Sequence, residues 1–265
     1  MAPAIPAATI IPVRVRPPGP GVEVLLLRRH RRATFMANAF VFPGGRIDEA
    51  DGDPRVAAIR ELFEEAGVLL ALPAVPAAES AAWRRRLLAG EATFAALLAD
   101  AGVAPAVDRL HPWARFVTPS FEPKRFDARF FVAEVPPDAA PRFDAQETVE
   151  QAWVTPAEAL ARQEAGTLPL PPPQIVTLTQ LQPFAARGLA ALFGEADGRA
   201  AAIRPVMPRA AACGGALTLL LPWDPDYDTL GTGEGTAIAA GAPGTDGPSR
   251  LVLEGERWRP TTKTA

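Results

Sequence analysis

A predicted helix with one apolar face and one acidic face constrains this chain more than any other feature. Apolar residues recur at helical spacing from about Pro54 or Arg55 to Ala66, and the next residue, Gly67, suits a C-terminal cap. At about 100° per residue, three glutamates fall on the side opposite to the apolar residues. These are Glu61, Glu64 and Glu65. We therefore expect a helix that packs by one face and gathers carboxylates on the other.

Three neighbouring carboxylates repel one another, at a cost on the order of a few tenths of a kcal/mol per exposed pair and more where water is excluded. A divalent cation cancels this repulsion. Carboxylate oxygens are hard ligands that suit Mg²⁺ or Mn²⁺, and such an ion can hold substrate phosphates, polarise phosphorus and activate water. Amphipathicity alone is more typical of an ordinary solvated face, so the residues around the helix decide between the two interpretations.

Those residues form a known pattern. A Phe-Pro-Gly-Gly turn ends at Gly45, and fifteen residues later Arg60 opens the run Arg-Glu-Leu-Phe-Glu-Glu-Ala-Gly-Val, which ends at Val68. The run resembles the core of the Nudix box, R-E-aliphatic-x-E-E-x-G-aliphatic. The resemblance implies an α/β fold, the Nudix α/β/α sandwich with a mixed sheet, and metal-dependent hydrolysis of a diphosphate linkage.

The resemblance also implies roles for individual positions. Glu61 and Glu65 match the principal metal ligands, and Glu64 matches an additional ligand or a carboxylate that orients water. The carbonyl of Gly45 matches a further metal contact, and Arg60 matches the arginine that orients the glutamates.

The first half of the motif departs from the family pattern. The family has a glutamate six residues after the leading glycine, with seven residues between it and the arginine. Counting from Gly45 reaches Asp51, and eight residues separate Asp51 from Arg60. Asp53 is an alternative for the same place. In the family this glutamate mainly orients the arginine, so the half that bears the ligands stays intact.

Some family members carry a general base or another metal carboxylate on a later loop. Here the run Gln-Glu-Thr-Val-Glu at residues 146–150 offers Glu147 and Glu150, and we prefer Glu147.

A longer stretch, roughly residues 9–185, resembles the Nudix branch that contains coenzyme A diphosphatases with large insertions. The similar segments are Leu25–Arg29, Phe35–Met36, Val41–Gly45, Trp113–Pro119, Phe126–Phe131, Trp153, Pro156 and Pro172–Gln174. The implied reaction splits the diphosphate bridge of coenzyme A or an acyl-CoA into 3′,5′-ADP and a phosphopantetheine product. The basic residues that could bind phosphate are Arg28, Arg29, Arg31, Arg32, Lys124 and Arg125, and we select Arg28, Lys124 and Arg125 among them.

Other functions stay open. An ADP-ribose, dinucleotide or RNA-cap hydrolase would use the same chemistry. A Nudix-fold module that binds a nucleotide without cleaving it belongs to another class, and the complete acidic helix argues against it because binding alone does not demand three glutamates.

The pattern along the rest of the chain predicts its organisation. We expect a hairpin at residues 9–27, with a Pro/Gly-rich turn at 17–21, and further strands at 40–42, 113–118, 128–135, 149–154, 216–221 and 249–254. Helices are predicted near residues 77–101, broken at Gly90, then from Pro156 toward Gln163 and at 174–192. We predict a Nudix domain over residues 1–198 with a helical insertion at about 77–101, and a Gly/Pro-rich extension over 199–265 packed on the same domain.

The composition of the chain limits the kinds of ligand and partner that we expect it to bind. The net charge of −3 provides no positive field for a long nucleic acid, so a small nucleotide is the expected ligand. Cys213 is the only cysteine, which excludes an intramolecular disulfide and favours a reducing, cytoplasmic setting. No apolar run reaches the roughly 18–20 residues that cross a bilayer. A homodimer stays open.

Overall fold

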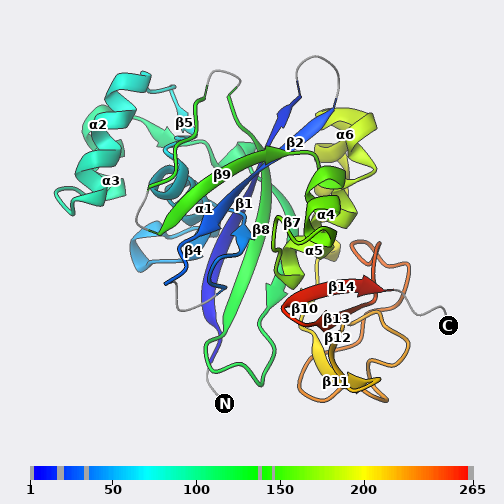
Figure 1. Cartoon of the computed structure of the whole chain (residues 1–265). Helices are drawn as coiled ribbons and strands as arrows, with labels where there is room; N and C mark the ends of the chain where they lie inside the picture. Colours follow the sequence, from blue (N-terminus) through cyan, green and yellow to red (C-terminus); the bar gives the residue numbers. More distant parts are fainter. Residues whose placement is uncertain (1–2, 17–20, 33–35, 137–138, 145–146, 262–265) are drawn as a thin grey trace.

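The computed structural model describes residues 3–16, 21–32, 36–136, 139–144 and 147–261, and an eight-stranded mixed sheet forms the centre of this part of the chain (Figure 1). The strand order is β10-β7-β8-β1-β2-β3, with β4 paired to β1 and β9 paired to β2. β1 runs parallel to β8, and β10 runs parallel to β7. The strands are β1 (Ile5–Val15), β2 (Val22–Arg29), β3 (Phe40–Val41), β4 (Gly44–Arg46), β7 (His111–Val117), β8 (Phe126–Glu134), β9 (Thr148–Val154) and β10 (Pro205–Val206).

The central strands are buried on both faces, and their alternating side chains separate two hydrophobic cores. Ile10 and Leu25 belong to one cluster, whereas their neighbours Ile11 and Leu26 belong to the other. Successive residues of a strand point to opposite faces, and a strand covered on both faces carries a nearly continuous apolar run. This explains why β1 and β2 have no polar face in the sequence.

Helices cover both faces of the sheet. On one face α1 (Pro54–Ala66) packs with α2 (Ala77–Leu88) and α3 (Phe94–Ala101). The other face is covered by α4 (Pro156–Glu164), α5 (Pro172–Leu181) and α6 (Phe184–Arg199) (Figure 1). The predicted α/β/α arrangement with a mixed sheet is confirmed.

The segment that carries α2 and α3 leaves and rejoins the domain through a short two-stranded sheet. β5 (Ala71–Leu72) pairs with β6 (Ala104–Pro105), and a single 3-10 turn, η2 (Val107–Arg109), follows. Gly90 has φ 72° between the two helices, a value that favours glycine. The two helices therefore project as one hairpin from the edge of the α1 layer.

The chain after α6 and the 3-10 turn η3 (Ala200–Ala202) forms a four-stranded antiparallel sheet, with Figure 1 colours running from yellow to red. Its strands are β11 (Arg209–Cys213), β12 (Ala216–Leu220), β13 (Arg250–Glu254) and β14 (Arg257–Thr261). Leu219, Trp223 and Leu251 lie in the same hydrophobic cluster as Trp113 of β7. The C-terminal sheet thus shares a core with the helical layer formed by α4–α6.

The structure corrects the predicted helix over residues 174–192, which is wrong as a single element. α5 ends at Leu181, and a new helix begins at Phe184 after Pro183, because proline has no N–H to donate to the preceding turn. Gly188 interrupts the second helix with φ 78° and ψ 175°. The strand β4, the 3-10 turn η1 (Glu49–Asp51) and the strands β11 and β14 were not predicted.

The predicted turn residues 17–20, together with Phe35 and Gln146, lie outside the described residues. None of the helices in the described ranges combines the length and apolar character needed to span a bilayer.

Candidate functional site

The residues at both ends of α1 form the caps that the sequence predicts. The Asp53 side chain caps the N-terminus by accepting a hydrogen bond from the Arg55 N–H at 2.8 Å, and Pro54 occupies the first helical position, where a missing N–H costs nothing. Gly67 ends the helix with φ 70° and donates its N–H to the Phe63 carbonyl. The apolar face then packs into the core, so the acidic face is held against the strands β1 and β4.

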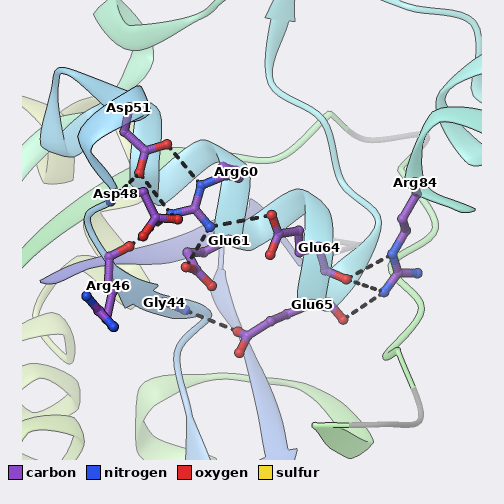
Figure 2. Close-up of polar contacts among 9 residues, drawn as sticks. All are labelled: Gly44, Arg46, Asp48, Asp51, Arg60, Glu61, Glu64, Glu65 and Arg84. Carbon is purple, nitrogen blue, oxygen red and sulfur yellow. Dashed lines mark hydrogen bonds and ion pairs between the residues drawn. The ribbon is translucent and has the colours of Figure 1, made fainter. Parts of the chain in front are cut away.

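The three glutamates differ in burial along this face. Glu65 is only 4% exposed, and one of its carboxylate oxygens accepts a hydrogen bond from the Gly44 N–H at 3.1 Å (Figure 2). The side chains of Glu61 and Glu64 are 13% and 27% exposed. The acidic face is therefore largely buried and is not an ordinary solvated surface.

Arg60 is the hub of the polar contacts in Figure 2. Its Nη1 donates to Glu61 at 2.8 Å and lies 3.4 Å from a carboxylate oxygen of Glu64, while Nη2 donates to the carbonyl of Arg46 at 2.9 Å. Burial alone would lower the pKa of this guanidinium, but the hydrogen bond with Asp51 and the surrounding carboxylates raise it overall. Arg60 therefore keeps its charge and orients two of the glutamates.

Asp51, not Asp53, is the orienting partner of Arg60. Its two carboxylate oxygens accept hydrogen bonds from Arg60 Nε and Nη2, each at 2.9 Å, and the side chain is 4% exposed. Asp53 instead caps α1 and pairs with Arg55. The extra residue before Arg60 is accommodated by the turn η1 and by Gly52, whose φ is 66°, so the shorter aspartate reaches the arginine.

The two glycines of the turn allow the backbone to pass close to the acidic face of α1. A Cβ on Gly45 would overlap the carboxylate of Glu61, and a Cβ on Gly44 would lie 2.6 Å from the carbonyl oxygen of Ala8. Neither position has room for a side chain, which explains why the turn before the helix uses glycine.

Mutual repulsion and burial change the acidity of the glutamates. Burial raises the pKa of Glu61 to about 7, while Arg60 opposes the shift and Glu64 adds to it. Burial raises the pKa of Glu65 well above its ordinary value, and the charge of Glu61 raises it further. The charge of Glu147 also raises the pKa of both residues, which places this loop residue in the electrostatic field of the acidic face.

The acidic face opens into a cleft of about 1070 Å³. Its polar part includes Glu61, Glu64, Gly45, Arg29, Lys124 and Glu147. Its apolar part is contributed by distant segments, among them Phe116, Phe130, Leu217, Leu219, Leu221 and Trp258. The cleft therefore combines carboxylates, cationic groups and a hydrophobic wall supplied by the C-terminal sheet.

Known proteins resemble this chain in sequence and in fold. A family model described as the NUDT19 Nudix domain matches residues 53–181. A protein named putative nudix hydrolase 7, from Caenorhabditis elegans, is 36% identical over 163 residues, which are 60% of this chain and 55% of that protein. Acyl-coenzyme A diphosphatase NUDT19 of Homo sapiens is 29% identical over 245 residues, which are 67% of this chain and 65% of that protein. The crystal structure of a NUDIX hydrolase from Alicyclobacillus acidocaldarius matches with a TM-score of 0.63 and 27% identity, covering 73% of this chain and 97% of that one.

The chain is similar to Nudix hydrolases in both sequence and fold. The matched family model and the NUDT19 relatives make the chain similar to the coenzyme A diphosphatase-like branch of these proteins. The chain spans 55% and 65% of the length of the worm and human relatives, respectively.

The fit of the α1 glutamates to a divalent ion depends on their spacing and on their donor chemistry. In the described part of the chain, no three His, Cys, Asp or Glu side chains gather closely enough to enclose a metal. Glu61 and Glu64 both contact Arg60. The donor chemistry nevertheless fits. Glu65 is buried and Glu61 is mostly buried; burial raises the pKa of Glu65, the charge of Glu61 raises it further, and a hard cation would offset that penalty.

The predicted phosphate-binding residues have different environments in the Nudix cleft. Lys124 lines it, with its ammonium 5.4 Å from the ring centre of Phe126. Arg28 lies outside the cleft lining and pairs with Glu150 at 3.0 Å. Arg125 is 5% exposed and donates to the Thr118 carbonyl at 3.1 Å. Only Lys124 of the three therefore faces the cleft.

Two more arginines belong to this site: Arg29, which the sequence offers as a phosphate-binding candidate, and Arg84, which it does not. Arg29 lines the cleft, and its charge lowers the pKa of Glu65, opposing the effect of burial. Arg84 of α2 donates to the carbonyls of Glu64 and Glu65 at 2.8–3.0 Å (Figure 2). Successive residues of a strand point to opposite faces, so Arg29 and Arg28 have different surroundings. Nothing in the local sequence connects Arg84 with the end of α1.

Proposed function

We propose that this chain hydrolyses the diphosphate linkage of coenzyme A or an acyl-CoA with the help of Mg²⁺ or Mn²⁺. The observation that carries the proposal is the position of the acidic face of α1. Glu61 and Glu64 lie in the wall of a cleft of about 1070 Å³, and the glycine turn brings the backbone at Gly45 against Glu61. Such a cleft can hold a diphosphate beside an ion-binding face and leave room for the rest of a nucleotide.

Glu61 and Glu65 would hold the ion, with the Gly45 carbonyl as a further ligand and Glu64 as an additional ligand or a group that orients water. When bound, a divalent ion supplies charge that neutralises the phosphates and lowers the pKa of water. The residues of the chain do the positioning. Arg60, fixed by Asp51 at 2.9 Å, orients Glu61 at 2.8 Å.

Glu147 is our candidate for the general base that accepts a proton from the attacking water. It lines the cleft and raises the pKa of Glu61 and Glu65 through its charge. Glu150, the alternative on the same loop, is paired with Arg28 at 3.0 Å, so it is less available for proton transfer.

The remainder of the cleft suits a substrate with both anionic and apolar parts. Lys124 and Arg29 offer positive charge to phosphate groups. The wall formed by Leu217, Leu219 and Trp258 offers an apolar surface to a pantetheine or acyl chain. The acyl-coenzyme A diphosphatase relatives support this choice of substrate class.

ADP-ribose, dinucleotides and capped RNA are the alternatives among substrates, because they carry the same linkage. A nucleotide-binding module without catalysis is the alternative outside the enzyme class. The burial of Glu65 against Gly44 argues for catalysis, since such a costly carboxylate is not needed to bind a nucleotide.

Product analysis tests the proposal. Coenzyme A, an acyl-CoA, ADP-ribose, a dinucleotide and capped RNA are incubated with Mg²⁺ or Mn²⁺, and products are identified by mass spectrometry. We expect 3′,5′-ADP and a phosphopantetheine product, loss of turnover in Glu65→Gln, and unchanged turnover in Glu79→Gln, which alters an exposed glutamate on α2. Absence of turnover on every compound would contradict an enzymatic function, and a preference for ADP-ribose would change the substrate.

We also propose that residues 1–198 form the Nudix domain, that residues 199–265 pack on it, and that the protein works in the cytoplasm. The shared core of Leu219 and Trp113 supports the second point, and the single Cys213 supports the third. Size-exclusion chromatography with light scattering distinguishes a monomer from the homodimer that the sequence leaves open.

A further inference from the structure

A second cavity, of about 720 Å³, lies beside the catalytic cleft and shares only Phe116 with it. The end of α6, strand β7 and the C-terminal loop before β13 surround it. Most of its lining is apolar, including Ile203, Val206, Trp223, Ile238 and Pro243. Its polar lining is therefore confined to a few groups whose partners can be traced.

Arg199, the last residue of α6, is the charged group deepest in this cavity. It is 4% exposed, and its guanidinium carbon lies 3.4 Å from the ring centre of Trp113. Within the described residues, its Nε and Nη2 have no hydrogen-bond partner. Burial lowers the pKa of Arg199 to about 10, with Glu195 and Asp246 opposing the shift, so the group is still charged at neutral pH.

Two further buried groups at the cavity lack partners in the part of the chain that the structure describes. They are the indole N–H of Trp113 and the side-chain oxygen of Gln180, whose amide nitrogen donates to the Gly244 carbonyl at 2.7 Å. Glu195 and Asp246 are exposed and form no ion pair with Arg199 among the described contacts. Buried polar groups are nearly always satisfied, and a buried unpaired charge is especially costly.

The geometry of the unpaired donors indicates what satisfies them. Nε and Nη2 form one edge of the planar guanidinium, and this edge matches two oxygens of a carboxylate or phosphate. The indole N–H adds a third donor, while the apolar lining suits a hydrocarbon body. Water would satisfy hydrogen bonds but would not neutralise the arginine.

We propose that this cavity is a second ligand site, which binds a small organic anion whose carboxylate or phosphate group pairs with Arg199 and whose apolar body contacts the lining between Trp113 and Trp223. The ligand differs from the substrate of the cleft because the site carries no acidic group for a metal. It therefore recognises the anion directly, in a cavity that meets the cleft at Phe116.

Four probes test the proposal by calorimetry and thermal shift: octanoate, octyl phosphate, inorganic phosphate and the uncharged octanamide. We expect octanoate or octyl phosphate to bind at least tenfold more tightly than octanamide and to raise the melting temperature. Octanoate and octyl phosphate together distinguish a carboxylate from a phosphate ester. Inorganic phosphate alone would show that the apolar lining is not used and would overturn that part of the proposal.

Variants locate the binding. Arg199→Gln should abolish the preference for the anions. Because this buried change can affect folding, Gln180→Glu provides a second test: it adds a carboxylate to the same cavity and should weaken anion binding at least tenfold. Lys124→Gln, in the cleft, should leave it unchanged. Equal binding of octanoate and octanamide, or binding lost only in Lys124→Gln, would overturn the assignment.

Discussion

Replacing Asp51 with asparagine tests the part of the site in which this chain departs from the family pattern. Asp51 and Arg60 form a buried pair, with side chains 4% and 10% exposed and two hydrogen bonds of 2.9 Å. Removing one charge from such a pair costs about 3–5 kcal/mol. Because Glu61 and Glu64 also contact Arg60, we expect the lower end, about 3 kcal/mol.

The matched control is Asp53→Asn. Asp53 is a half-exposed helix cap, and asparagine caps a helix about as well as aspartate does, so the change should cost less than about 0.5 kcal/mol. Urea denaturation of the metal-free protein at pH 7, followed by tryptophan fluorescence, measures both free energies of unfolding. If Asp53→Asn destabilises the protein as much as Asp51→Asn, the assignment of Asp51 as the partner of Arg60 is refuted.

Three more predictions follow from the same site. In Gly45→Ala, the new methyl group meets the Glu61 carboxylate, so turnover should fall by about 100-fold or more; activity with an unchanged circular dichroism spectrum checks this, and full activity would contradict it. Arg84→Ala leaves carbonyls at the end of α1 without their donor and should cost roughly 1–3 kcal/mol of unfolding free energy, whereas exposed Arg85→Ala should cost little in the same denaturation assay. Burial raises the pKa of Glu61 to about 7, so metal-free stability should fall by up to about 3 kcal/mol as pH rises from 4.5 through 7; an equally steep fall in Glu61→Gln would show that another group is responsible.

The elements set by local sequence were predictable. The apolar residues of α1 recur at helical spacing, and both Asp53 and Gly67 cap it as residues of their types commonly do. The central strands followed from their β-branched and aliphatic runs. The end of α5 was missed because the amphipathic pattern continues across Gln182 and Pro183, although the proline interrupts the backbone hydrogen bonds.

The parts that depend on distant contacts were not predictable. Strand alternation shows that Arg28 and Arg29 point to opposite faces, but only the fold shows that the cleft lies on the side of Arg29. Leu219 and Trp258 come from the C-terminal part of the chain and line the same cleft as Glu61 and Glu64 of α1. Arg84 reaches the end of α1 from a separate helix, a contact that requires the tertiary arrangement.

The sequence could not decide between Asp51 and Asp53, because the extra residue before Arg60 leaves the path of the backbone open. Counting residues leaves both in reach of Arg60. The turn η1 and the positive φ of Gly52 decide between them by directing Asp51 inward and leaving Asp53 at the start of α1. A count along the chain cannot report the path of the backbone between two fixed points.

We propose that the acidic face of α1 holds a divalent ion in the cleft. Electron paramagnetic resonance of Mn²⁺ titrated into the protein measures this directly, with Glu61→Gln, Glu65→Gln and the exposed-site control Glu79→Gln. We predict that the first two variants weaken Mn²⁺ binding by roughly 10–100-fold or more, while Glu79→Gln binds as the unmodified protein does. Equal Mn²⁺ affinity in all four proteins would contradict the account.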